Sequence, residues 1–129
     1  MSMASIRTVR IPGPDHPITI EKNRNRIVVT YAGQVIADTT EALTLREAGY
    51  APVHYIPRRD ADMALLEPST HTTYCPYKGD CSYYSIAVDD KRADNAVWTY
   101  PEPYAAVAGI KDHLAFYPSR VDSIEEQPV

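Results

Sequence analysis

Short stretches of alternating apolar and polar residues recur along the chain, separated by turn signals at intervals of roughly eight to twelve residues. This alternation is typical of β-strands, because successive side chains of a strand point to opposite faces. Gly, Pro, Asn and Asp occupy the breaks, where they favour tight turns. The pattern predicts a mainly β fold with strands at residues 18–20, 26–31, 34–38, 43–45, 53–56, 82–88, 92–100 and 115–117.

The links between these strands predict how they pair. Turn residues at 23–25 and at 32–33 favour a meander or a pair of hairpins across 17–38. A tight turn at 89–91 joins the strands on either side of it into another hairpin.

Three segments have a mixed or helical pattern. Residues 39–48 fit either a short helical turn or a strand, and the alternation within them favours the strand. Asp60 is placed to cap a short helical segment at 61–66. The main helix candidate is residues 104–114, where apolar residues recur near helical spacing, although Gly109 weakens the middle.

The length of 129 residues fits a single domain. We expect a flexible N-terminal arm at 1–16, one folded domain at 17–118 and a polar, acidic tail at 119–129. No apolar run approaches the roughly 18 residues of a membrane-spanning helix. The net charge of −4 argues against general binding to a nucleic-acid backbone. Neither a membrane nor a nucleic acid is therefore an expected partner.

The two cysteines are too few for a disulfide scaffold or a four-thiolate zinc site. The N-terminus also lacks the apolar core of a signal peptide. We therefore expect reduced thiols and a cytoplasmic location. The oligomeric state stays open, and a symmetric dimer is possible because it is the commonest oligomer.

Residues 69–85 gather most of the chemically distinctive side chains. Cys75 lies near Lys78 and His71, and a neighbouring cation favours the nucleophilic thiolate. These three are the candidate catalytic residues, with Cys75 as the nucleophile and His71 or Lys78 assisting. A buried cysteine that only fills the core and a solvated turn are the structural alternatives. Cys75 and Cys81 could also pair as a disulfide or as metal ligands.

Charged and aromatic residues elsewhere suggest a ligand cleft. Arg58 could clamp a carboxylate or a phosphate, and Asp60 with Asp62 could hold a divalent cation, although a solvated turn explains all three. Several aromatic side chains could line a cleft, Trp98 first, or could fill the core. The candidate ligand-binding residues are Tyr55, Arg58, Asp60, Tyr77, Tyr84, Trp98 and Tyr100.

An ordered set of motifs resembles a known family. The motifs are His-Tyr-Ile-Pro-Arg at 54–58, Leu-Leu-Glu-Pro-Ser at 65–69, Cys-Pro-Tyr-Lys-Gly at 75–79, Ser-Tyr-Tyr-Ser at 82–85 and Asn-Ala-Val-Trp-Thr-Tyr-Pro-Glu-Pro at 95–103. Together they resemble the bacterial and fungal family called domain of unknown function 427, over roughly residues 18–122. The family also has a nucleotidyltransferase-like name, which implies no established reaction.

The resemblance implies a fold more specific than the strand pattern does. The family is similar to β-tent (Mss4-like) proteins, in which two antiparallel sheets meet at an angle. We therefore expect two such sheets and one short helix near the C-terminus. Many β-tent relatives hold zinc with two Cys-x-x-Cys knuckles, which this chain lacks, so the resemblance implies no zinc here.

Three functions fit these expectations. The leading one is a small-molecule-binding domain in which Arg58 and Lys78 attract an anionic or polar group and the aromatic side chains form an apolar wall. The second is a transferase-like or hydrolase-like enzyme with Cys75 as nucleophile. The third is a protein-interaction module anchored by exposed aromatic side chains. We expect no cofactor and no metal.

Overall fold

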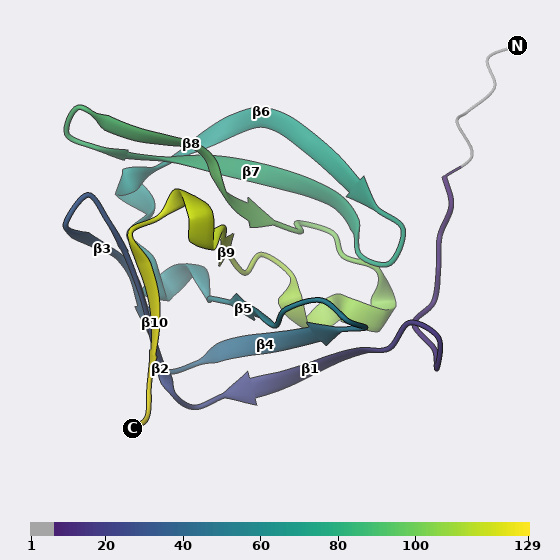
Figure 1. Cartoon of the computed structure of the whole chain (residues 1–129). Coiled ribbons are helices and arrows are strands. Elements are labelled where there is room, and N and C mark those ends of the chain that lie inside the picture. The colour runs from purple at the N-terminus through teal and green to yellow at the C-terminus, as the bar shows by residue number, and fades with distance from the viewer. Residues whose placement is uncertain (1–6) are drawn as a thin grey trace, which may run out of the picture.

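The computed structural model describes residues 7–129, which form ten strands and four short 3-10 helices (Figure 1). The first six residues of the predicted arm lie outside the described residues. In chain order, the elements are β1 (Ile18–Asn23), β2 (Arg26–Tyr31), β3 (Gln34–Thr39), β4 (Ala42–Glu47), β5 (Val53–Tyr55), η1 (Arg58–Asp60), η2 (Met63–Leu65), β6 (Leu66–Cys75), β7 (Gly79–Val88), β8 (Lys91–Thr99), η3 (Ala105–Ile110), β9 (Ala115–Phe116), η4 (Pro118–Arg120) and β10 (Ser123–Gln127).

The strands form three antiparallel sheets. The four-stranded sheet β6-β7-β8-β9 lies at the top of Figure 1, and the sheet β1-β4-β5 lies below it. The third sheet, β10-β2-β3, stands at the left of the view and connects the two layers. The mainly β prediction is confirmed, with three hydrogen-bonded sheets where the resemblance implied two. The likeness to β-tent proteins stays a prediction.

Two predicted hairpins are confirmed, and one predicted pairing is wrong. β2 and β3 pair across a turn at Ala32 and Gly33, whose φ angles of 52° and 76° suit a tight hairpin. β7 and β8 pair across the predicted turn at 89–91. β1, however, pairs with β4 and not with β2. Asn23 Oδ1 accepts a hydrogen bond from the Asn25 N–H at 3.0 Å, and the chain turns there from one sheet into another.

The predicted helix at 104–114 is shorter and tighter than expected. Only Ala105–Ile110 is helical, as the 3-10 helix η3, and its dihedral angles are interrupted at Val107. Val107 and Ile110 are the buried side chains of this segment. Their spacing of three residues matches one turn of a 3-10 helix, so the same two side chains face the core.

Two further segments differ from their predictions. The predicted tail contains β10, which pairs with β2, and its Ile124 packs against the buried core. The predicted helical segment at 61–66 is the single turn η2. Its cap is Asp62, whose carboxylate accepts the Ala64 N–H at 3.3 Å. The predicted cap, Asp60, accepts the Thr39 hydroxyl instead.

The apolar interior is divided into two clusters. One lies around β2, β3 and the second half of β7, and includes Ile27, Val29 and Ile86. The other lies between β4–β5 and the first half of β7, and includes Leu45 and Tyr55. This second cluster forms the floor of the site described below. Between residues 7 and 129, no helix has the length and apolar character needed to cross a membrane.

Candidate functional site

Residues 69–85 form a hairpin in which a sharp turn joins β6 to β7. The Lys78 N–H donates to the Cys75 carbonyl at 3.2 Å within this turn, and the Tyr104 N–H donates to the Lys78 carbonyl at 3.0 Å. Gly79 follows with φ +108°, and a Cβ there would lie 3.3 Å from the Glu102 carbonyl oxygen. A side chain at position 79 would therefore strain the turn that fixes Lys78.

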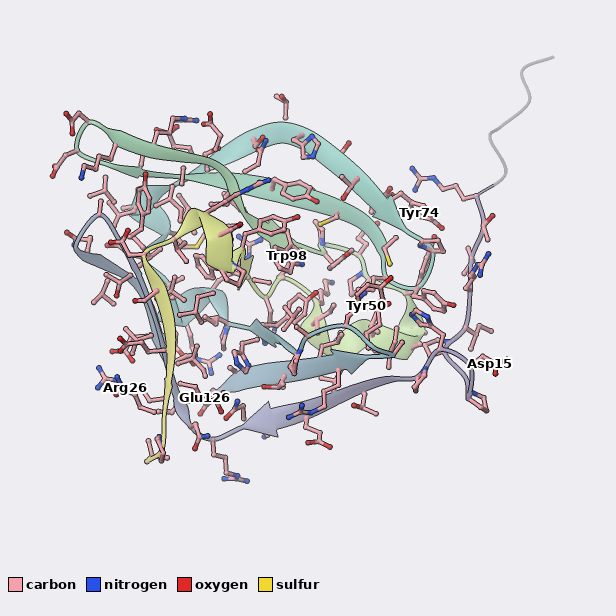
Figure 2. The ribbon with its side chains drawn as sticks, in the orientation of Figure 1. Asp15, Arg26, Tyr50, Tyr74, Trp98 and Glu126 are labelled. Carbon is pink, nitrogen blue, oxygen red and sulfur yellow. The ribbon has the colours of Figure 1, made fainter. Side chains whose placement is uncertain are left out.

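A pocket of about 270 Å³ lies beneath this hairpin, between β4–β5 and β7–β8. Residues two apart on a strand share a face, so Cys81 and Tyr83 of β7 reach the pocket together, beside Trp98 of β8. Figure 2 shows Trp98 and Tyr50 within this part of the molecule. The aromatic lining consists of Tyr50, Tyr55, Tyr83, Trp98, Tyr100 and Tyr117.

Trp98 is held in a fixed position by two aromatic neighbours. Its indole N–H donates to the Tyr55 hydroxyl at 3.2 Å, and its ring lies 4.5 Å from that of Tyr117. Burial raises the pKa of Tyr55, and more so that of Tyr100, well above the usual phenol range. Both hydroxyls therefore stay protonated at neutral pH and remain hydrogen-bond donors.

One end of the pocket is polar. Lys78 Nζ lies 2.5 Å from Glu47 Oε1, and His16 Nε2 lies 2.7 Å from Glu47 Oε2. The side chains of Lys78 and Glu47 are only 9% and 15% exposed. The His16 ring stacks on that of Tyr77 at 4.0 Å, with 4° between the planes. An ion pair is thus largely withdrawn from water at the edge of an otherwise aromatic pocket. We name this group the Lys78–Glu47–His16 cluster.

The charge state of Glu47 follows from two opposing effects. Burial alone would raise its pKa, but the hydrogen bonds from Lys78 and His16, with the Lys78 charge, outweigh burial. The net result is a pKa of Glu47 below the usual 4.5. Glu47 is therefore a carboxylate at neutral pH, and it forms an ion pair with Lys78.

We expect Glu47→Gln to reduce the sensitivity of the fold to acid. Because the folded-state pKa of Glu47 is lowered, its ionised form stabilises the fold above the unfolded pKa, and this stabilisation is lost as pH falls through the folded value. Melting temperatures measured between about pH 6 and about pH 3 should therefore fall less steeply for Glu47→Gln than for the unchanged chain. Glu21→Gln, on the exposed face of β1, should keep the original slope, and equal slopes for all three proteins would contradict the assignment.

Cys75 extends the polar end toward β6. Its Sγ accepts a hydrogen bond from Lys78 Nζ at 3.9 Å, and the residue is partly exposed. Cys81 is buried, and burial raises the pKa of its thiol. Cys75 is thus the cysteine that has both a cation beside it and access to solvent.

The structure brings most of the sequence-predicted residues to the pocket or to the Lys78–Glu47–His16 cluster. Cys75 and Tyr77 contact the Lys78–Glu47–His16 cluster, whose lysine was also predicted. His71 lies on the exposed side of β6, with its ring 4.6 Å from that of Tyr83. The predicted residues that line the pocket are Tyr55, Lys78, Trp98 and Tyr100.

Arg58, Tyr84 and Asp60 lie outside the pocket lining. The Arg58 guanidinium donates to the Tyr84 hydroxyl and to the Asp112 carbonyl, both at 2.8 Å. Asp60 accepts the Thr39 hydroxyl at 2.7 Å. These contacts tie η1 to the sheets. Within residues 7–129, no three His, Cys, Asp or Glu side chains gather as metal ligands would.

The sequence-based lists of candidate residues lack five polar or aromatic residues of the site: Glu47, His16, Tyr50, Tyr83 and Tyr117. His16 belongs to the predicted arm, whose described part runs beside the motif hairpin, where the Arg10 N–H donates to the Pro76 carbonyl at 2.9 Å. Glu47 ends an ordinary amphipathic strand. No local pattern marks either residue, because 31 positions separate each link of the cluster in sequence.

A larger cavity of about 360 Å³ adjoins the pocket, since Val53 and Trp98 line both. Its walls are mostly apolar, and its one titratable side chain is His54. His54 Nδ1 is 2.9 Å from the Thr44 hydroxyl, and Nε2 is 3.3 Å from Glu126. Lys78 and Glu47 line the smaller pocket and not the larger cavity, so the smaller pocket is the candidate site.

Comparison with known proteins identifies the family of the chain. None of the curated proteins compared with the chain matches it. The family model described as domain of unknown function 427 (DUF427) matches residues 19–127. This match runs from the second residue of β1 to the last residue of β10. The chain therefore belongs to the DUF427 family.

Proposed function

We propose that the domain binds a small planar molecule that carries a carboxylate or another hydrogen-bond acceptor. The observation that supports this most directly is the pocket itself, which is lined by five tyrosines and the one tryptophan of the chain and has a largely buried ion pair at one end. Pockets of this kind, apolar with a few convergent polar groups, are typical of ligand sites.

The size of the pocket limits the ligand. Its volume of about 270 Å³ lies just below the roughly 300–1,000 Å³ of sites for drug-sized molecules. One ring, or two fused rings, with small substituents would fill it. Aromatic walls favour flat occupants because ring faces stack on them.

The polar end limits the chemistry of the ligand. The Lys78 ammonium has three N–H donors, of which one is directed to Glu47 and one to Cys75. The third has no acceptor among residues 7–129 and can meet one on a ligand, and the Tyr55 and Tyr100 hydroxyls are further donors in the same lining. Lys78 and the two buried hydroxyls can therefore donate to a ligand, which suits an anionic or carbonyl-bearing molecule.

Trp98 makes the proposal directly testable, because it is the only tryptophan and lines the pocket. Titration with benzoate, nicotinate or a nucleobase should change its fluorescence saturably. Benzoate should bind more tightly than benzamide, since only benzoate brings a charge to Lys78. Tyr50→Ala should weaken binding about tenfold, because a stacking contact is worth roughly 1–3 kcal/mol.

Tyr50 is 71% exposed, so its replacement should leave the fold intact. The matched control is Val35→Ala, which removes another exposed apolar side chain on β3, outside this pocket, and should keep the original affinity. Unchanged Trp98 fluorescence across the panel, or equal affinity in the Tyr50→Ala protein, would count against the proposal.

The cytoplasmic location expected from the sequence is also a proposal. It is supported by the two cysteines, which are both free. Persisting free thiols are typical of reducing compartments. Localisation of the tagged full-length chain would test it.

A further inference from the structure

The larger cavity beside the pocket reaches from the surface into the buried core. Its volume is about 360 Å³. Three residues of its lining, Val29, Ile56 and Phe116, are at most 4% exposed. Two others, Ala51 and Pro118, are exposed and form part of its rim. Domain interiors are close-packed, with few voids larger than a water molecule, so a space of this size bounded by core side chains is a candidate for holding a molecule.

The wall of this cavity suits a hydrocarbon. Of the described residues in its lining, His54 is the only one with a titratable side chain. Both ring nitrogens of His54 have partners, since Nδ1 lies 2.9 Å from the Thr44 hydroxyl and Nε2 lies 3.3 Å from Glu126. The Trp98 indole N–H is directed to Tyr55, and the other described residues of the lining have apolar side chains. An occupant therefore gains by burying apolar surface, whereas a charged group would lose its water without gaining a partner.

The cavity and the pocket share two wall residues, Val53 and Trp98. Val53 pairs with Leu45, two residues before the end of β4 that carries the carboxylate of the polar end. Trp98 pairs with Tyr83, four residues into β7 from the turn that holds Lys78. Along both strands, the shared wall thus lies inward from the polar end. A ligand whose carboxylate meets Lys78 would have its opposite end at this wall.

We propose that the pocket and the larger cavity together hold one ligand, an aromatic carboxylate with a hydrocarbon chain on the ring opposite the acid group. The inference rests on the proposed function, which places the ring and the acid in the pocket, and it adds the chain that occupies the cavity. Together the two volumes fall within the roughly 300–1,000 Å³ of ligand sites, which the pocket alone does not reach. The ligand class is therefore an amphipathic molecule with a flat, acidic head.

The test compares benzoate with its 4-methyl, 4-ethyl, 4-propyl and 4-butyl derivatives, using the full-length protein. Trp98 lines both spaces, so its fluorescence follows binding of the whole series. Each methylene that enters the cavity should tighten binding about fourfold, because it leaves water for an apolar wall. Terephthalate, which carries a second carboxylate in place of the chain, should bind more weakly than benzoate.

Methyl NMR places each part of the ligand. Ile124 lines only the larger cavity, and Leu45 lines only the pocket. Benzoate should shift the Leu45 methyl signals alone, whereas 4-butylbenzoate should shift the signals of both residues. Ile124→Ala should weaken binding of 4-butylbenzoate severalfold and leave the benzoate Kd unchanged, because it removes part of the cavity wall. The matched control Glu125→Ala, on the exposed side of the same strand, should keep both affinities.

The unchanged chain decides the outcome even if the Ile124→Ala protein does not fold. Equal affinity for benzoate and 4-butylbenzoate, or an Ile124 signal that does not move, would overturn the inference, and the proposed function then stands if benzoate binds. If no member of the series binds, both fail. If butylbenzene shifts the Ile124 signal while none of the acids binds, the cavity is a separate apolar site, and both fail as well.

Discussion

The Lys78→Met protein should unfold with a free energy about 3 kcal/mol below that of the unchanged chain. Lys78 and Glu47 are 9% and 15% exposed, so removing the ammonium leaves a carboxylate in a mostly aromatic pocket. Of the residues that the structure describes, only His16 then remains to hydrogen-bond that carboxylate. The cost comes from the uncompensated charge, since a carboxylate stripped of water and of its partner is far less stable than a hydrated one. Urea unfolding followed by circular dichroism measures the change.

A double variant separates this cause from a loss of side-chain volume. In Lys78→Met/Glu47→Leu the unpaired charge is gone, and most of the lost stability should return, because apolar residues of similar size often replace a buried ion pair without cost. Lys22→Met is the control on an exposed lysine and should change stability by less than about 0.5 kcal/mol. A Lys78→Met protein as stable as this control would mean that the ion pair is effectively hydrated.

Local sequence predicted those parts of the fold that local geometry determines. The β2–β3 turn needs positive φ at Ala32 and Gly33, and the motif hairpin needs it at Gly79. These requirements are visible in the sequence as turn residues between alternating stretches. The partner of β1 was not visible, because the pairing of β1 with β4 depends on contacts across the whole first half of the domain.

The same distinction between local and long-range contacts applies to the candidate site. One turn brings Cys75 and Lys78 together, so their closeness in the sequence was enough to predict their contact. Glu47 and His16 reach the same place only through the tertiary fold. Arg58 shows the reverse case. It follows Tyr55 closely in sequence, yet its guanidinium is directed to Tyr84 and the Asp112 carbonyl, outside the pocket lining.

The segment predicted as a tail gives the second large effect. If residues 119–129 were a tail, ending the chain at Val121 would cost nothing. The structure instead pairs β10 with β2, and Ile124 of β10 lies opposite Val29 and packs against the core. We expect the shortened chain to lose roughly 3 kcal/mol of stability, from the apolar area of Ile124 and the backbone hydrogen bonds of a whole edge strand.

The family match supports this expectation independently, since it extends to residue 127, where β10 ends. A point variant separates the two contributions to the loss. Ile124→Ala keeps the strand, so it should cost less than the truncation. We expect a loss of about 1–2 kcal/mol, because the side chain is only partly buried. Glu125→Ala, which is exposed on the same strand, should cost almost nothing. Equal urea midpoints for the truncated and full-length chains would show that the fold is complete without β10, and that the sequence pattern was the better guide to where the domain ends.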